Sequence, residues 1–243
     1  MIDKSFGFLP DTEQTMDTRD YIFSSSMPVC PEPVDLGVFL KKVFDQGKTE
    51  SCVACAISAG RIILGIEKLP SVRFLYFNSR FLHDATERDS GTYIRLAFKA
   101  AARWGFATDE VCPFSVEKIN KHPGFASFWC AFDSRKLEYH KMFSSGGLRE
   151  NQIQQALSLG YPVVFGVGVG AEFTKDTGPT IVNDFEKGGV VGRHAMLIVG
   201  YNQTHFKVLN SWGSRWRKNG FCWVPYSALD VESARDFTVM GRA

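Results

Sequence analysis

Residues 45–67 have the sequence DQGKTESCVACAISAGRIILGIE, in which a polar turn runs directly into a long apolar segment. From Ser51 onward small residues come first, isoleucine and leucine follow, and no clearly polar face is left. A helix that is apolar all round is normally buried between other elements. Ser51 suits the N-cap of such a helix, which puts Cys52 in its first turn. The segment therefore predicts a buried helix over residues 51–67 with a cysteine at its beginning.

The pattern of the sequence after this helix predicts the fold class. A second helix is expected over residues 92–104, where apolar positions recur with a period of 3.6, and a third over 148–159, which Gly160 ends. Short β-branched and aromatic runs predict strands over residues 162–169, 195–201, 206–209 and 221–224. Residues 202–205 are typical of a hairpin connection. Helices first and strands later indicate an α+β fold, with a helical half, an antiparallel sheet half and a cleft between them for an extended ligand.

Composition excludes several classes of protein. Of the 243 residues, 44% are apolar and 22% charged, which is typical of a globular protein and not of a disordered or collagen-like chain. The 28 basic and 26 acidic residues leave a formal charge of +2, too small for a long-range attraction to nucleic acid or anionic lipid. No apolar run reaches the roughly 18 residues that a membrane span needs. We therefore expect neither a nucleic-acid nor a membrane partner.

The ends and the cysteines suggest a location and a domain division. The N-terminus lacks the basic and apolar regions of a secretory signal, and six cysteines are too few for a disulfide scaffold. We therefore expect reduced thiols and an intracellular, cytoplasmic protein. Residues 1–33 are turn-rich and predict an N-terminal arm or short leader. Residues 34–243 predict the folded domain, with a helical lobe roughly over 45–145 and a β lobe over 146–243.

Gln46, Cys52, His194 and Asn210, in this order along the chain, point to nucleophilic catalysis. Unpaired N–H groups at a helix N-terminus favour a thiolate, so Cys52 has a physical reason to be reactive. His194 can take its proton, and the Asn210 side chain can orient the imidazole ring. Gln46 precedes the cysteine by six residues, so its amide can reach the oxyanion of a tetrahedral intermediate together with the Cys52 N–H. The expected resting state is a thiolate–imidazolium pair.

These motifs resemble the papain family of cysteine proteases, peptidase family C1, particularly bacterial-type members that open with Asp-Gln-Gly-x-x-x-Ser-Cys. The resemblance covers roughly residues 34–226 and includes the buried helix after Cys52, His194-Ala195 before a strand, and Asn-Ser-Trp-Gly from Asn210. It implies a papain-like two-lobed fold and a thiol endopeptidase, a hydrolase that cuts polypeptides through a Cys-His-Asn triad and an acyl-enzyme. It implies no cofactor.

The resemblance also implies roles for substrate-binding residues. Trp212 would shield the hydrogen bond between Asn210 and His194 from water. Ser90 and Gly91 resemble the cleft wall whose backbone pairs with an extended substrate. Ala195 would form the floor of the pocket for the second residue before the cut. The implied partners are a polypeptide substrate and a possible proteinaceous inhibitor, and the chain is expected to be a monomer.

Three positions depart from the family pattern. Thr49 stands where members commonly carry a structural cysteine, so one expected disulfide is missing. Glu50 replaces a glycine and adds negative charge, which would raise the pKa of the nearby thiol, while Arg193 beside the histidine would partly offset this effect. Val53 replaces the aromatic residue that usually follows the nucleophile.

Other interpretations stay open at this point. Cys55 could be the nucleophile of a Cys-x-x-Cys motif, but it lies nine residues after Gln46 rather than six, and one turn deeper in a buried helix. Neither paired CxxC motifs nor HExxH occur, so we expect no metal site. The basic residues 215–218 indicate a solvated loop. The same machinery could also transfer an acyl group to an amine, or the fold could bind peptides with little turnover.

Overall fold

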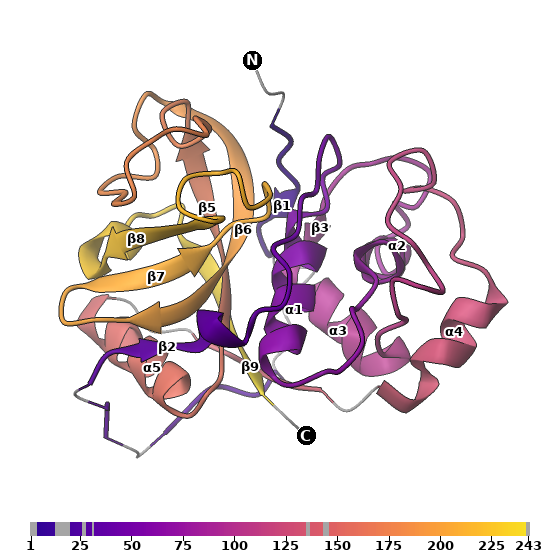
Figure 1. The fold of residues 1–243 in the computed structure, drawn as a ribbon, viewed down its shortest axis with the longest axis horizontal. Coiled ribbons are helices and arrows are strands. Elements are labelled where there is room, and N and C mark those ends of the chain that lie inside the picture. The colour runs from indigo at the N-terminus through magenta and orange to yellow at the C-terminus, as the bar shows by residue number, and fades with distance from the viewer. Residues whose placement is uncertain are drawn as a thin grey trace.

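A computed structural model describes residues 4–12, 20–25, 28–30, 32–134, 137–142 and 146–241. A helical half and a sheet half lie side by side, with the N-terminal strand between them (Figure 1). This arrangement confirms the α+β fold. None of the helices in these ranges is long and apolar enough to cross a bilayer.

The expected central helix is α1, Cys52–Ile63, in which every residue except Arg61 is buried. It packs against α2 (Val72–Phe81) and α3 (Ile94–Trp104) on one side and against the sheet on the other, which explains why it has no polar face. It ends before residue 67, because Gly65 adopts a positive φ of 93°. Ser51 holds the N-cap position but makes no capping bond, since its hydroxyl pairs with that of Thr49 at 2.7 Å.

The remaining helical elements differ in part from the expectation. The helix predicted over 92–104 is α3, and it starts two residues later because Thr92–Tyr93 form the short strand β3. The predicted third helix is α5, Gly146–Ser158. Sequence periodicity missed two helices, α2 and α4 (Phe125–Ala131), and the short 3-10 turns at Leu36–Phe39, Phe132–Ser134 and Tyr226–Leu229.

The sheet half is an antiparallel sheet with the order β4-β9-β5-β6-β7-β8, and β2 pairs with β6 in addition. Its strands are β2 (Val34–Asp35), β4 (Glu138–Lys141), β5 (Val163–Gly170), β6 (Val190–Tyr201), β7 (His205–Leu209), β8 (Phe221–Pro225) and β9 (Arg235–Gly241). All four predicted strands are present, as β5 to β8. The predicted hairpin is also confirmed, because Asn202 Oδ1 accepts hydrogen bonds from the N–H groups of Thr204 and His205. Strand β4 belongs to this sheet although it precedes residue 146.

The N-terminal arm enters the interior of the molecule. Strand β1, Phe8–Leu9, pairs in parallel with β3, and Gly7 and Phe8 are buried between the two halves (Figure 1). Farther along, Asp11 pairs with Lys141 and Asp20 pairs with Arg95. Residues 1–3, 13–19, 26–27 and 31 of the arm lie outside the described residues. The arm is thus attached at several points and brings residues 4–9 to the place where the candidate catalytic residues gather.

Candidate active site

Cys52 is the first residue of α1 and is fully buried. Backbone N–H groups of Ala195, Gly7 and Val53 lie near its sulfur and act to lower the pKa of the thiol. Burial nevertheless raises the pKa of the thiol to about 11, because a charged thiolate would lose its solvation; these N–H groups oppose the rise, and the carboxylate of Glu50 adds to it. The direction expected for Glu50 is therefore confirmed, but burial is the larger cause.

His194 and Asn210 meet because β6 and β7 are neighbours in the sheet. His194 Nε2 lies 2.7 Å from Asn210 Oδ1, which also accepts a hydrogen bond from the Ser211 N–H. Burial lowers the pKa of His194 to about 4; the hydrogen bond that His194 donates to Asn210 Oδ1 opposes this shift, and the positive charge of Lys4 adds to it. His194 Nδ1 is buried without a hydrogen-bond partner.

The two pKa shifts have one consequence for the expected thiolate–imidazolium pair. A raised thiol pKa and a lowered imidazole pKa both favour the uncharged forms. With the arm in place, burial therefore favours a neutral thiol at Cys52 and a neutral imidazole at His194. The thiolate–imidazolium pair therefore stays a prediction, one that this closed arrangement disfavours because both groups are buried.

Gln46 is held between the two halves and points at the arm. Its Oε1 accepts a hydrogen bond from Ser211 Oγ at 2.6 Å, and its Nε2 donates to Thr49 O at 2.7 Å. The second Nε2 contact is with the carbonyl oxygen of Ser5, at 3.1 Å. A side-chain amide aimed at a peptide carbonyl beside a cysteine is the arrangement that an oxyanion donor needs.

Trp212 covers the histidine. Its ring stacks on that of His194 with centroids 4.6 Å apart and 29° between the planes. The ring of Phe6, from the arm, meets both rings edge-on at 6.2 Å. These aromatic contacts cover the His194 ring, and shielding of its bond to Asn210 by Trp212 stays a prediction.

The predicted cleft wall contacts the arm through its backbone. Thr92 N donates to Gly7 O at 2.9 Å, and Gly91 N donates to the Tyr76 hydroxyl at 3.0 Å. Gly91 has a φ of 72°, and a Cβ there would lie 2.4 Å from Gly7 O, so only glycine allows this close approach. Ser90 Oγ is buried without a hydrogen-bond partner. The role of Ser90 and Gly91 as a cleft wall stays a prediction, and sequence reasoning missed Thr92, whose N–H bonds the arm.

The predicted pocket floor lies under Phe8. Ala195 in β6 is paired with Gly166 in β5, and both are buried. A Cβ on Gly166 would lie 2.1 Å from the Phe8 ring, which is only 3% exposed. Gly166 was not predicted as a site residue, since a glycine in a strand shows its purpose only when the neighbouring side chain is known.

Cys55 has a different environment. Its sulfur lies 3.9 Å from Ser51 Oγ, and burial raises its pKa far above the ordinary range. Among the described contacts, those of the arm involve Cys52 and not Cys55. In the same part of the chain no group of three or more His, Cys, Asp or Glu residues is placed to hold a metal ion.

The comparisons with known proteins agree on one family. The sequence model for papain family cysteine proteases matches residues 31–234. An uncharacterized peptidase C1-like protein of Acanthamoeba polyphaga mimivirus is 28% identical over 272 residues, which cover 98% of this chain and 87% of that protein. The crystal structure of xylellain, a cysteine protease from Xylella fastidiosa, matches with a TM-score of 0.89 and 26% identity, over 99% of this chain and 97% of that one. Digestive procathepsin L 3 of the Tenebrio molitor larval midgut shares the fold, with a TM-score of 0.72 at 18% identity over 100% and 76% of the two chains.

Proposed function

Because the chain belongs to the papain family of cysteine proteases, we propose that it hydrolyses internal peptide bonds of extended polypeptides with Cys52 as nucleophile and His194 as proton carrier. Asn210 orients the imidazole, and Gln46 with the Cys52 N–H stabilises the oxyanion. Gly91, Thr92 and Ala195 bind the part of the substrate before the cut, and Trp212 covers the histidine.

One observation carries this proposal: a stretch of the chain's own backbone already occupies the site. The Ser5 carbonyl accepts from Gln46 Nε2 at 3.1 Å, and the Gly7 carbonyl accepts from Thr92 N at 2.9 Å. The side chain of Phe8 fills the pocket beside Gly166. An extended peptide therefore fits these groups, and the groups that it contacts are those that the reaction requires.

The arm runs in the direction opposite to a substrate. In a substrate, the residue that fills the pocket comes earlier in the chain than the carbonyl that is attacked at Gln46. The substrate chain therefore runs, from N-terminus to C-terminus, from the pocket to Gln46. In the arm the order is reversed, because Ser5 is at Gln46 and Phe8, three residues later, is in the pocket. We infer that the arm keeps the protein latent and that it must leave before a substrate binds.

Departure of the arm prepares the chemistry. Water then reaches Cys52 and His194, so their pKa values return toward ordinary values and the thiolate–imidazolium pair forms. The thiolate attacks the scissile carbonyl, and the oxyanion forms between Gln46 Nε2 and the Cys52 N–H, where loss of one donor costs about 3 kcal/mol. His194 protonates the leaving amine, and water then releases the acyl group from sulfur.

Two cysteine variants test this function. We expect Cys52→Ser to abolish hydrolysis of a quenched fluorescent peptide with Phe as the second residue before the cut. We expect Cys55→Ser to keep most of it, because Cys55 has no described contact with the arm. Both variants are compared in the full chain carrying Gly7→Ala. This substitution should open the site, because a Cβ at Gly7 would lie 1.7 Å from the carbonyl oxygen of Glu50. Loss of activity in Cys55→Ser with retention in Cys52→Ser would reject the assignment.

A further inference from the structure

The side chain of Lys4 lies in a site built for a cation. Its Nζ atom is 2.7 Å from Asp176 Oδ1 and 5.1 Å from the centroid of the Trp212 ring. The lysine side chain is only 8% exposed, and that of Asp176 is 25% exposed. A lysine is rarely so buried unless its charge is matched, and here a carboxylate and the face of an indole ring match it.

The walls of this site are held by contacts that do not involve the arm. Asp176 lies in the connection between β5 and β6, and its carbonyl accepts a hydrogen bond from Arg217 N at 2.8 Å. The guanidinium of Arg217 donates to the carbonyls of Phe173 and Pro179 in the same connection. The Phe173 ring packs on Trp212 at 5.5 Å. The site therefore keeps its shape when Lys4 leaves.

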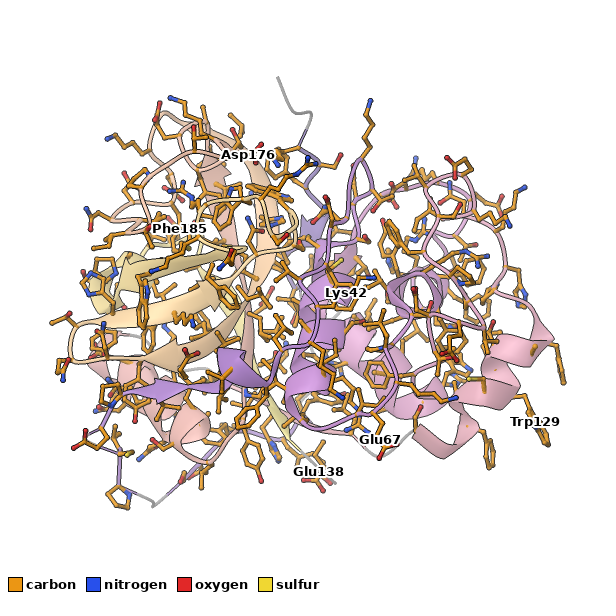
Figure 2. The ribbon with its side chains drawn as sticks, viewed as in Figure 1. Lys42, Glu67, Trp129, Glu138, Asp176 and Phe185 are labelled. Atoms are coloured by element: carbon orange, nitrogen blue, oxygen red, sulfur yellow. The ribbon has the colours of Figure 1, made fainter. Side chains whose placement is uncertain are left out.

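The site lies on the leaving-group side of the reacting bond. Phe8 occupies the pocket for a residue before the cut, and Ser5 lies at Gln46, so Lys4 is at the opposite end of the occupied groove. Trp212, which forms one wall, stacks on His194, the group that protonates the leaving amine. Figure 2 shows Asp176 in the sheet half, at the end of the molecule where the N-terminal segment enters.

We propose that Asp176 and Trp212 form a cation subsite that selects substrates with lysine or arginine shortly after the scissile bond. The proposal rests on the proposed function and adds a substrate class to it: polypeptides that are basic on the leaving-group side. A glutamate in that place would face the Asp176 carboxylate and be rejected by like charge. The arm uses the same preference, since its own lysine occupies the subsite.

Peptide kinetics test the subsite in the full chain carrying Gly7→Ala. The quenched peptides share the acyl half, with Phe in the pocket position, and carry Lys, Arg, Gln or Glu at the first or the second position after the cut. At whichever of the two positions gives the larger effect, we expect kcat/KM for the Lys and Arg peptides to exceed that for the Gln peptide about tenfold. The Glu peptide should have the lowest kcat/KM. Asp176→Asn should lower kcat/KM for the Lys and Arg peptides to the level of the Gln peptide, so that the tenfold preference is lost. Asp184→Asn, an exposed carboxylate in the same connection, is the matched control and should change nothing.

Several outcomes would overturn the subsite. An unchanged Lys/Gln ratio in Asp176→Asn excludes a charge-selective role, and an equal loss for all four peptides indicates a purely structural one. Asp176→Lys supplies a second variant, in which the preference should invert toward Glu. Binding of the Lys and Gln peptides to the chain carrying Gly7→Ala and Cys52→Ser separates the two proposals. If the Lys peptide binds the double variant more tightly than the Gln peptide, but the Gly7→Ala chain that keeps Cys52 does not cleave it, the subsite is retained and the proposed hydrolysis is rejected. Equal binding of the two peptides would reject the subsite.

Discussion

The two ends of the arm segment in the active site are held by opposite kinds of contact. At one end Phe8 is 3% exposed and fills the space left by the missing side chain of Gly166. At the other end Lys4 pairs with Asp176, which is still partly open to water. Both ends close the same site, but the free energies behind them differ in origin and in size.

One end therefore anchors the arm, and the other end favours one kind of side chain. Burying a phenylalanine ring contributes about 2 to 3 kcal/mol and needs no particular partner beyond a cavity of the right size. A partly exposed ion pair contributes about 1 kcal/mol or less, but it distinguishes a cation from every other side chain. We infer that Phe8 provides most of the affinity of the arm for the site. Lys4 contributes less, but it occupies the subsite of Asp176 and Trp212 that prefers a cation.

The largest effect is expected from a change between the two ends, Gly7→Ala. A Cβ at Gly7 would lie 1.7 Å from the carbonyl oxygen of Glu50, which is backbone and cannot move aside cheaply. The arm must then leave the site at both ends. Turnover of the quenched peptide should rise from near background to the full rate of the open enzyme. Gly147→Ala is the control, because no atom lies within 4 Å of a Cβ there.

The pH dependence of thiol labelling measures the same release directly. In the closed chain the pKa of Cys52 is raised to about 11, so the thiolate that reacts with iodoacetamide appears only at high pH. In Gly7→Ala the pKa should fall toward the ordinary value of about 8.5 or below it. Near pH 7.5 labelling of Cys52, located by peptide mass spectrometry, should then be about 100-fold faster or more. Identical pH profiles in the two chains would contradict closure by the arm.

A smaller effect is expected at the apolar end. Phe8→Ala removes the ring from the pocket and should weaken closure by about 3 kcal/mol, which raises the fraction of open molecules about 100-fold where closure is tight. The measurement is the initial rate on the quenched peptide, before and after addition of excess peptide with Phe at the pocket position. Phe39→Ala is the control, since that ring is 59% exposed. A rate equal to that of wild type would show that the pocket does not anchor the arm.

The sequence was sufficient for the fold class and for the contact between two of the four candidate catalytic residues. The all-apolar pattern of residues 52–63 predicted a helix packed on both sides, and α1 is such a helix. The order of Gln46, Cys52, His194 and Asn210 predicted one site, and His194 and Asn210 are in hydrogen-bond contact there. These features are local patterns or chain-order motifs, which a sequence carries explicitly.

The occupied state of the site could not be predicted in the same way. Residues 4–9 have no period and no motif, because a strand of two residues that pairs in parallel with another short strand leaves no pattern. Gly166 and Asp176 acquire a role only through the side chains opposite them, Phe8 and Lys4, more than 150 residues away in the chain. The burial of Cys52 and His194, which disfavours their charged forms, is equally absent from the sequence motifs.

The smallest effect is expected at the charged end, from Lys4→Gln. The substitution removes the ion pair with Asp176 but leaves the Phe8 anchor, so closure should weaken by about 1 kcal/mol and the open fraction should rise about fivefold. Added salt should reduce the difference between wild type and Lys4→Gln, because it screens the partly exposed pair, whereas the effect of Phe8→Ala should persist in salt. Initial rates on the quenched peptide between 50 mM and 500 mM sodium chloride give both values. If Lys4→Gln opened the site as much as Phe8→Ala at every salt concentration, the charged end would be the anchor, and the division of roles between the two ends would be wrong.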